Sequence, residues 1–103
     1  MVRHIFLWKV AKGADPNEVI RILNELPQKL SMIRTWTVGK HQGPPGASGD
    51  LWDYGLVCDF DSFEELQKYS DAPFHMEVVE KLVPMFSARA VCDFEIPASG
   101  GKR

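Results

Sequence analysis

The chain has 103 residues, of which 45% are hydrophobic and 25% are charged, and its formal net charge at pH 7 is −2. This size and composition fit one globular domain with a single modest core. We expect no nucleic-acid partner, because the net charge is negative and no Lys/Arg cluster occurs. We expect no membrane partner either, because no apolar run approaches the roughly 20 residues that cross a bilayer.

The cysteines and the first residues bear on the cellular compartment. Cys58 and Cys92 lie in separate apolar stretches without C-x-x-C spacing. We interpret them as small buried hydrophobic residues. The alternative is a disulfide bridge or a reactive thiol. The opening MVRHIFLWKV is too short and too polar for a signal peptide. We therefore expect a cytoplasmic protein.

The first two elements are predicted to be a strand and a helix. Residues 3–10, RHIFLWKV, are apolar on both alternating sets, which indicates a strand covered on both faces. A helix is predicted from residue 16 to about 26–30, with apolar residues at helical spacing. Asp15 can cap it, Pro16 suits its first position, and Glu18 completes a capping box.

Two further strands are predicted on either side of a loop. Residues 32–40 are rich in β-branched and aromatic side chains, and residues 51–60 alternate between two sets of side chains. Between them, HQGPPGASGD (41–50) is rich in Gly and Pro and is interpreted as a long, mobile hairpin connection.

A proline interrupts the second predicted helical region. Ser62 and Glu65 form a capping box that opens a helix through about Tyr69. Pro73 then breaks or redirects the chain, and FHMEVVEKLVPMF continues as another helical piece. Its inward face is predicted to consist of Met76, Val79, Val83 and Phe86.

The last predicted strand covers residues 89–96, and residues 98–103 are expected to form a disordered tail, so the domain would span residues 1–97. The order β-α-β-β-α-β predicts an α+β, ferredoxin-like fold with both helices on one face of an antiparallel four-stranded sheet. The other face of the sheet would expose apolar side chains to water unless another surface packs against it. A second copy across a two-fold axis supplies one, which predicts a homodimer through the sheet faces.

Four stretches resemble the stress-responsive dimeric α/β-barrel (Dabb) family: VRHIFLWKV, WDYGLVCDFDSFEELQKY, APFH and ARAVCDFE. The most specific features are the histidine on the first strand, the Y-x5-H spacing from Tyr69 to His75, and the terminal DFE strand. The resemblance covers nearly the whole chain outside residues 41–50 and the tail. It implies a dimer whose two sheets close into a barrel.

The resemblance also implies an activity, because the family includes a plant polyketide (olivetolic acid) cyclase. In that cyclase a tyrosine and a histidine at the same spacing orient and deprotonate a poly-β-keto thioester for an intramolecular aldol condensation. Tyr69 and His75 match these positions, and His4 matches a pocket histidine on the first strand. Tyr54 stands where the cyclase has another pocket histidine, so one titratable group is missing here.

The residues themselves support a similar chemistry. His75 lies in the first turn after Pro73, where unpaired N–H groups and the helix dipole disfavour an imidazolium ion. A neutral ring can act as a general base, and Tyr69 could donate a hydrogen bond to a developing enolate oxygen. We predict His75, Tyr69 and His4 as catalytic residues. The predicted substrate-binding residues are aromatic: Tyr54, Phe6, Trp8, Phe74 and Phe86.

Each of these residues has a plainer interpretation. Tyr69 and His75 can hold the kink in shape by bonding each other or nearby backbone. His4 can be a core histidine bonded to a neighbour such as Asp93 or Tyr54, and the aromatic residues can belong to the core or to a dimer interface.

Two functions are therefore open. The first is cofactor-independent proton abstraction, cyclisation or lyase chemistry on a small apolar carbonyl compound. The alternative is a non-catalytic, stress-responsive dimer that binds a ligand or a partner. No cofactor or metal is expected in either case, because the sequence has no nucleotide-binding motif and no His or carboxylate cluster at ligand spacing.

Overall fold

The computed structural model describes residues 1–44 and 49–97. The predicted tail and part of the predicted mobile loop lie outside these described residues. The elements follow in the order β1 (Val2–Val10), α1 (Pro16–Leu23), α2 (Leu26–Lys29), β2 (Thr35–Lys40), β3 (Tyr54–Phe60), α3 (Phe63–Asp71), α4 (Pro73–Leu82), the short 3-10 helix η1 (Val83–Met85) and β4 (Phe86–Glu95).

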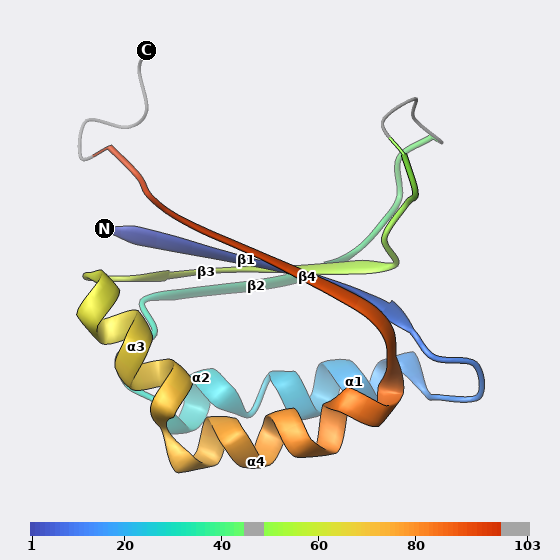
Figure 1. The fold of residues 1–103 in the computed structure, drawn as a ribbon, viewed down its shortest axis with the longest axis horizontal. Coiled ribbons are helices and arrows are strands. Elements are labelled where there is room, and N and C mark those ends of the chain that lie inside the picture. Colours follow the sequence, from blue (N-terminus) through green and yellow to red (C-terminus); the bar gives the residue numbers. More distant parts are fainter. Residues whose placement is uncertain (45–48, 98–103) are drawn as a thin grey trace.

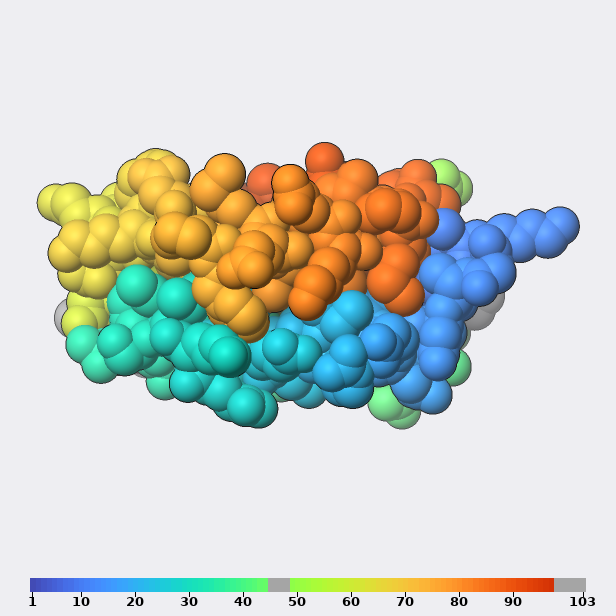
Figure 2. Space-filling model, turned by 90° about the horizontal axis from the view of Figure 1, so that it is seen from below, coloured from blue at the N-terminus to red at the C-terminus, as the bar shows by residue number. Residues whose placement is uncertain are grey.

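The four strands form one antiparallel sheet in the order β2-β3-β1-β4. All helices lie on one face of this sheet (Figure 1). Seen from the helical side, α1 and α2 run beside α3 and α4 as two bands over the sheet (Figure 2). The predicted ferredoxin-like fold is confirmed. No helix among residues 1–44 and 49–97 is long and apolar enough to span a membrane.

The hydrophobic core lies between the helices and the sheet. Strand residues alternate between faces, so Trp8, Leu56 and Phe60 point to the helices and are almost fully buried. Burial of such side chains stabilises a fold by about 1.5–3 kcal/mol each. The buried hydrophobic residues in the described part of the chain are Val2, Trp8, Val19, Ile22, Leu23, Leu26, Leu56, Cys58, Phe60, Leu66, Tyr69, Val78 and Leu82.

The opposite face of the sheet carries no helix in the described part of the chain (Figure 1). Ile5 and Leu7 of β1, one of the two inner strands, lie there and are only half-buried. The expectation that β1 is covered on both faces is therefore met on one face within a single chain. Cys92 stands opposite Ile5 in the sheet and is exposed, so the interpretation of both cysteines as buried was wrong for Cys92.

The helix starts are partly as predicted. Ser62 Oγ accepts a hydrogen bond from the Glu65 backbone N–H at 3.2 Å, as expected of an N-cap. The Glu65 carboxylate does not complete the predicted capping box and accepts instead from Lys68 Nζ at 3.1 Å. Asp15 also caps its helix, but Glu18 does not complete a capping box. Its carboxylate instead binds the Arg21 guanidinium at 2.7 and 2.8 Å. The first helical region is also divided into α1 and α2.

The break in the second helical region lies at Ala72. This residue has an extended backbone (φ −62°, ψ 132°) and separates α3 from α4, which begins at Pro73. Starting at Pro73 turns His75, Val78 and Leu82 toward the sheet, since residues three to four apart share a helix face. The predicted inward face was therefore wrong for Met76 and Val83, which are exposed. Val79 is exposed but borders the cavity, and Phe86 packs against the core from the start of β4.

Candidate active site

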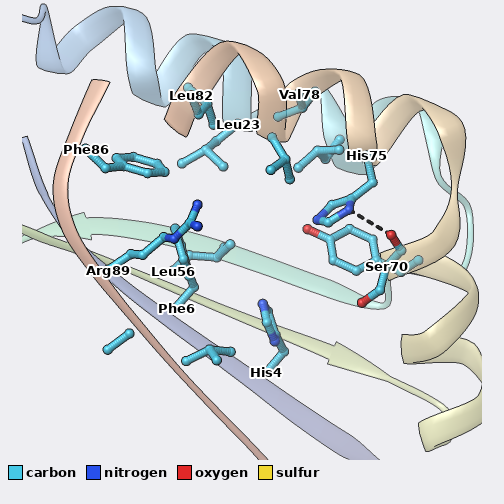
Figure 3. A pocket seen from close by; sticks show the side chains of 15 residues that line it. His4, Phe6, Leu23, Leu56, Ser70, His75, Val78, Leu82, Phe86 and Arg89 are labelled. Atoms are coloured by element: carbon cyan, nitrogen blue, oxygen red, sulfur yellow. Dashed lines mark hydrogen bonds between the residues drawn. The ribbon is translucent and has the colours of Figure 1, made fainter. Parts of the chain in front are cut away.

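A cavity of about 560 Å³ opens between the helical layer and the sheet, beside α4 and β4 (Figure 3). Most of its wall is aliphatic or aromatic, and a few polar side chains are grouped within it. The lining residues are His4, Phe6, Leu23, Leu26, Leu56, Tyr69, Ser70, His75, Val78, Val79, Leu82, Phe86, Arg89, Ala90 and Val91. An apolar hollow with a few convergent polar groups is the usual form of a small-molecule site.

His75 connects the helix break to the cavity. Its Nδ1 lies 3.1 Å from the backbone oxygen of Ser70, which belongs to the last turn of α3 (Figure 3). Carbonyls at a helix end lack intrahelical partners, so His75 supplies one. In the neutral ring Nδ1 must then be the donor, which leaves a lone pair on Nε2. The structural role and any chemical role of His75 thus use different nitrogens.

The surroundings of His75 favour this neutral ring. Burial lowers the pKa of His75 below its ordinary value, and the nearby His4 lowers it further, while the hydrogen bond to Ser70 acts in the opposite direction. The side chain is half-buried and lines the cavity. An imidazole of this kind is available as a proton acceptor near neutral pH.

Tyr69 lies against His75 across the break. The two ring centroids are 4.4 Å apart, and the Tyr69 ring also packs 5.0 Å from the Phe60 ring. Only 3% of Tyr69 is exposed. Burial, and to a smaller degree the Cys58 sulfur, raises the pKa of the phenol above its ordinary value. Tyr69 therefore keeps its proton and can donate a hydrogen bond into the cavity that it lines.

His4 stands on β1 on the sheet side of the same cavity (Figure 3). Its ring centroid lies 6.1 Å from that of Tyr69. Its Nδ1 is hydrogen-bonded to the Asp93 carboxylate on the neighbouring strand β4. A carboxylate on one ring nitrogen fixes the orientation of a histidine and leaves the other nitrogen to act. The sequence analysis gave Asp93 and Tyr54 as possible hydrogen-bond partners of His4, and the structure shows the bond to Asp93.

The structure brings together five of the eight predicted site residues. His4, Phe6, Tyr69, His75 and Phe86 line the cavity, while Tyr54, Trp8 and Phe74 do not.

Each of the three others is engaged elsewhere. Trp8 is fully buried and stacks between Phe6 and Tyr54, with ring centroids 5.6 Å from each. Its Nε1 is a buried donor without a hydrogen-bond partner in the described part of the chain. Phe74 is partly buried against the core and lies under the Lys29 ammonium group, 5.0 Å from its ring centroid.

Arg89 is a lining residue that the sequence analysis missed. It lies opposite Trp8 in the sheet, on the face toward the helices, and its side chain extends into the cavity (Figure 3). The alternation of residues 89–96 was the available signal, since it places Arg89 on the same side as Asp93. No group of three His, Cys, Asp or Glu side chains that could hold a metal occurs in residues 1–44 and 49–97.

The antiparallel sheet with its helices on one face defines a ferredoxin-like domain, and comparison with known proteins gives its family. The family model of the stress responsive A/B barrel domain (Dabb) matches residues 2–96, and the chain belongs to this family. Among curated proteins, no sequence matches the chain significantly.

Solved structures share the fold over almost the whole chain. A dimeric ferredoxin-like protein of unknown function from Thermobifida fusca is 26% identical, with a TM-score of 0.75, and the match covers 92% of this chain and 90% of that one. A dimeric ferredoxin-like protein from Bacteroides fragilis is 27% identical, with a TM-score of 0.67 and coverages of 92% and 95%. A hydroxynitrile lyase from Passiflora edulis is 18% identical, with a TM-score of 0.83 and 94% of both chains covered.

Proposed function

We propose that this protein is a homodimer whose cavity binds a small apolar carbonyl compound and removes a proton from the carbon next to the carbonyl, without a cofactor. The observation that carries the proposal is the arrangement of His75. One nitrogen is used at the helix break, the other is left as an acceptor, and the Tyr69 phenol lies beside it in the same apolar cavity.

The reaction needs only these groups and the substrate. His75 Nε2 takes the proton, the electrons of the broken C–H bond form the enolate double bond, and the carbonyl electrons move to oxygen. The Tyr69 hydroxyl donates a hydrogen bond to that oxygen as its charge grows. The enolate carbon then attacks a second carbonyl of the same molecule, and the His75 imidazolium returns its proton to the new alkoxide.

His4 has a supporting part in this proposal. Its hydrogen bond with Asp93 fixes the orientation of the ring at the sheet side of the cavity, where His4 can orient the substrate or transfer a proton. The same acid–base set would also serve a lyase: the base removes the hydroxyl proton, the C–O bond becomes a carbonyl, and the group on the same carbon leaves with the bonding electrons and takes up the proton from the imidazolium. The fold shared with the hydroxynitrile lyase is compatible with this variant of the proposal.

The dimer is supported by the uncovered face of the sheet. Ile5, Leu7 and Val57 are apolar, half-buried and adjacent there. Monomeric proteins rarely leave such a patch on a sheet without a cover. Two similar structures are described as dimeric, which agrees with a second copy in that position.

The proposal is tested by proton exchange in D2O. A panel of β-keto thioesters and lactones is incubated with the protein, and NMR follows the loss of the signal from the proton next to the carbonyl. We expect exchange above the buffer rate, a loss of about 10²–10⁴-fold in His75→Gln, and a loss of about 10²–10³-fold in Tyr69→Phe.

His41→Gln is the matched control, because His41 is exposed and lies outside the cavity. Equal exchange rates for the wild type, His75→Gln and His75→Ala would remove His75 as the base. Binding of the panel without any exchange would instead support the alternative function, a dimer that captures a ligand without reacting it.

A further inference from the structure

The cavity holds one permanent charge that the proposed proton transfer does not use. Of the lining residues, Arg89 alone is ionised at all working pH values, and its side chain extends into the hollow from β4 (Figure 3). The walls around it are apolar, with Phe6, Leu82 and Phe86 among them. Arg89 is exposed, so its guanidinium keeps contact with water, and its N–H donors are available to an acceptor oxygen on a ligand that enters the cavity.

Arg89 differs from the other arginines in the described part of the chain. Each of the others binds a carboxylate with two nitrogens: Arg3 binds Asp59, Arg21 binds Glu18, and Arg34 binds Asp61. Arg89 has no carboxylate within 4.0 Å among residues 1–44 and 49–97. The carboxylate four residues further along β4, that of Asp93, is bound to His4.

We infer that Arg89 is a specificity-determining residue that binds a carboxylate on the ligand, so the favoured substrates are apolar carbonyl compounds with one carboxylate away from the reacting carbon. The inference rests on the proposed carbonyl site and narrows its substrate class. The planar fork of a guanidinium matches the two oxygens of a carboxylate. A single guanidinium balances one negative charge, which favours a monoanion.

The positions of the groups suit such a ligand. His75 and Ser70 stand at one end of the cavity, at the break between α3 and α4, whereas Arg89 reaches in from β4 (Figure 3). An apolar body between the two ends would lie against Leu23, Leu56 and Val78. The carboxylate would then fix the direction in which the ligand enters and place its carbonyl beside Tyr69.

The test compares the binding of octanoate and octan-1-ol, which differ in the head group and share the apolar chain. Titrations followed by NMR shifts of the protein backbone give both the affinity and the place of binding. In the wild type we expect octanoate to bind roughly five- to tenfold more tightly than octan-1-ol, as is typical of a charge-assisted hydrogen bond that is partly open to water. Added salt should weaken only the octanoate complex.

Three variants test whether Arg89 causes the preference for octanoate. Arg89→Gln should remove the preference for octanoate and leave the affinity for octan-1-ol unchanged, while Arg89→Lys should keep part of the preference. Arg34→Gln, which loses an exposed arginine remote from the cavity, should behave as the wild type.

The inference is overturned if octanoate does not bind, if both compounds bind the wild type equally, or if Arg89→Gln weakens both to the same extent. Neither probe has to react, so the outcome does not depend on His75 as a base. Conversely, if only the Arg89 inference fails, the wild type should still exchange the proton of a neutral β-keto thioester, and His75→Gln should still lose that exchange.

Discussion

The two faces of the sheet are built from similar side chains but differ in what lies over them. The helical face buries Trp8 and Phe60 under two bands of helices, yet a hollow remains between α4 and β4. The opposite face presents Ile5 and Val57 without a helix in the described residues. One face leaves room for a small molecule, and the other presents a broad surface that suits a second chain.

The polar groups of the two faces differ as well. On the uncovered face Asp59 is 4% exposed, and its carboxylate accepts hydrogen bonds from Arg3 at 2.9 and 3.1 Å and from Thr35 at 2.9 Å. This group is fully paired within the chain. In the cavity His75 uses one nitrogen only, and Arg89 has no carboxylate partner in the described residues. Paired charges suit a buried interface, whereas unused polar groups suit a ligand.

The largest effect is expected from Ile5→Glu, which places a carboxylate at the centre of the uncovered face. If a second copy covers this face, the wild type sediments as a dimer and the variant as a monomer, because a buried unpaired charge costs several kcal/mol. Sedimentation equilibrium at micromolar concentrations measures this difference. Met76→Glu, on the exposed side of α4, should remain a dimer.

The reactivity of the Cys92 thiol is a second test of whether the uncovered face is buried in a dimer. Cys92 stands beside Ile5 and is exposed in the single chain. It should react slowly with a thiol reagent in the wild type and quickly in Ile5→Glu. Cys58 should be unreactive in both, because burial raises its pKa to about 12. A wild type that sediments as a monomer, or a dimer that survives Ile5→Glu, would contradict the assignment of the two faces.

A smaller effect is expected from Asp59→Asn, which removes the charge from the ion pair on the uncovered face. Hydrogen bonds to charged groups contribute about 1.5–3 kcal/mol, and solvent screens the partly exposed Arg3, so urea unfolding at pH 7 should show a loss near the lower end of that range. Asp61→Asn is the matched control, because Asp61 and its partner Arg34 are both half-exposed and their contribution is screened by solvent.

The effect of Asp59→Asn should also depend on pH. Hydrogen bonding to Arg3 is the main cause that lowers the pKa of Asp59 in the folded chain. Such a group contributes stability above its unfolded pKa of about 4 and loses the contribution as the pH falls through the folded pKa. The difference between the wild type and Asp59→Asn should therefore be constant from pH 5 to 8 and shrink at lower pH. A difference that persists unchanged in acid would show that the pair is not responsible.

The fold was predictable because its signals are local. The short apolar run of residues 3–10, the alternation along residues 51–60, the cap at Ser62 and the break at Pro73 are each read from a few neighbouring residues. Together they give the order of strands and helices, and the ferredoxin-like arrangement follows from that order. The Y-x5-H spacing likewise pointed to Tyr69 and His75 as neighbours in space.

The details of the cavity were not predictable in this way. Which stripe of α4 faces the sheet depends on how the helix starts after Ala72, and sequence alone favoured Met76 and Val79 over Val78. Whether an aromatic side chain lines the hollow or fills the core depends on packing in three dimensions, which is why Trp8 was misplaced. Arg89 was missed because a charged residue on an edge strand normally points into water.

The most direct test of the proposed site is the protonation state of His75 in the folded protein. Nitrogen-15 NMR of the imidazole rings across a pH titration distinguishes the two neutral forms and gives the pKa. We predict a neutral ring at pH 7 with its proton on Nδ1, bound to Ser70, and a pKa below the ordinary histidine value of about 6.5. A charged ring at pH 7, or a neutral ring with its proton on Nε2, would contradict the account, because no acceptor would then face the cavity.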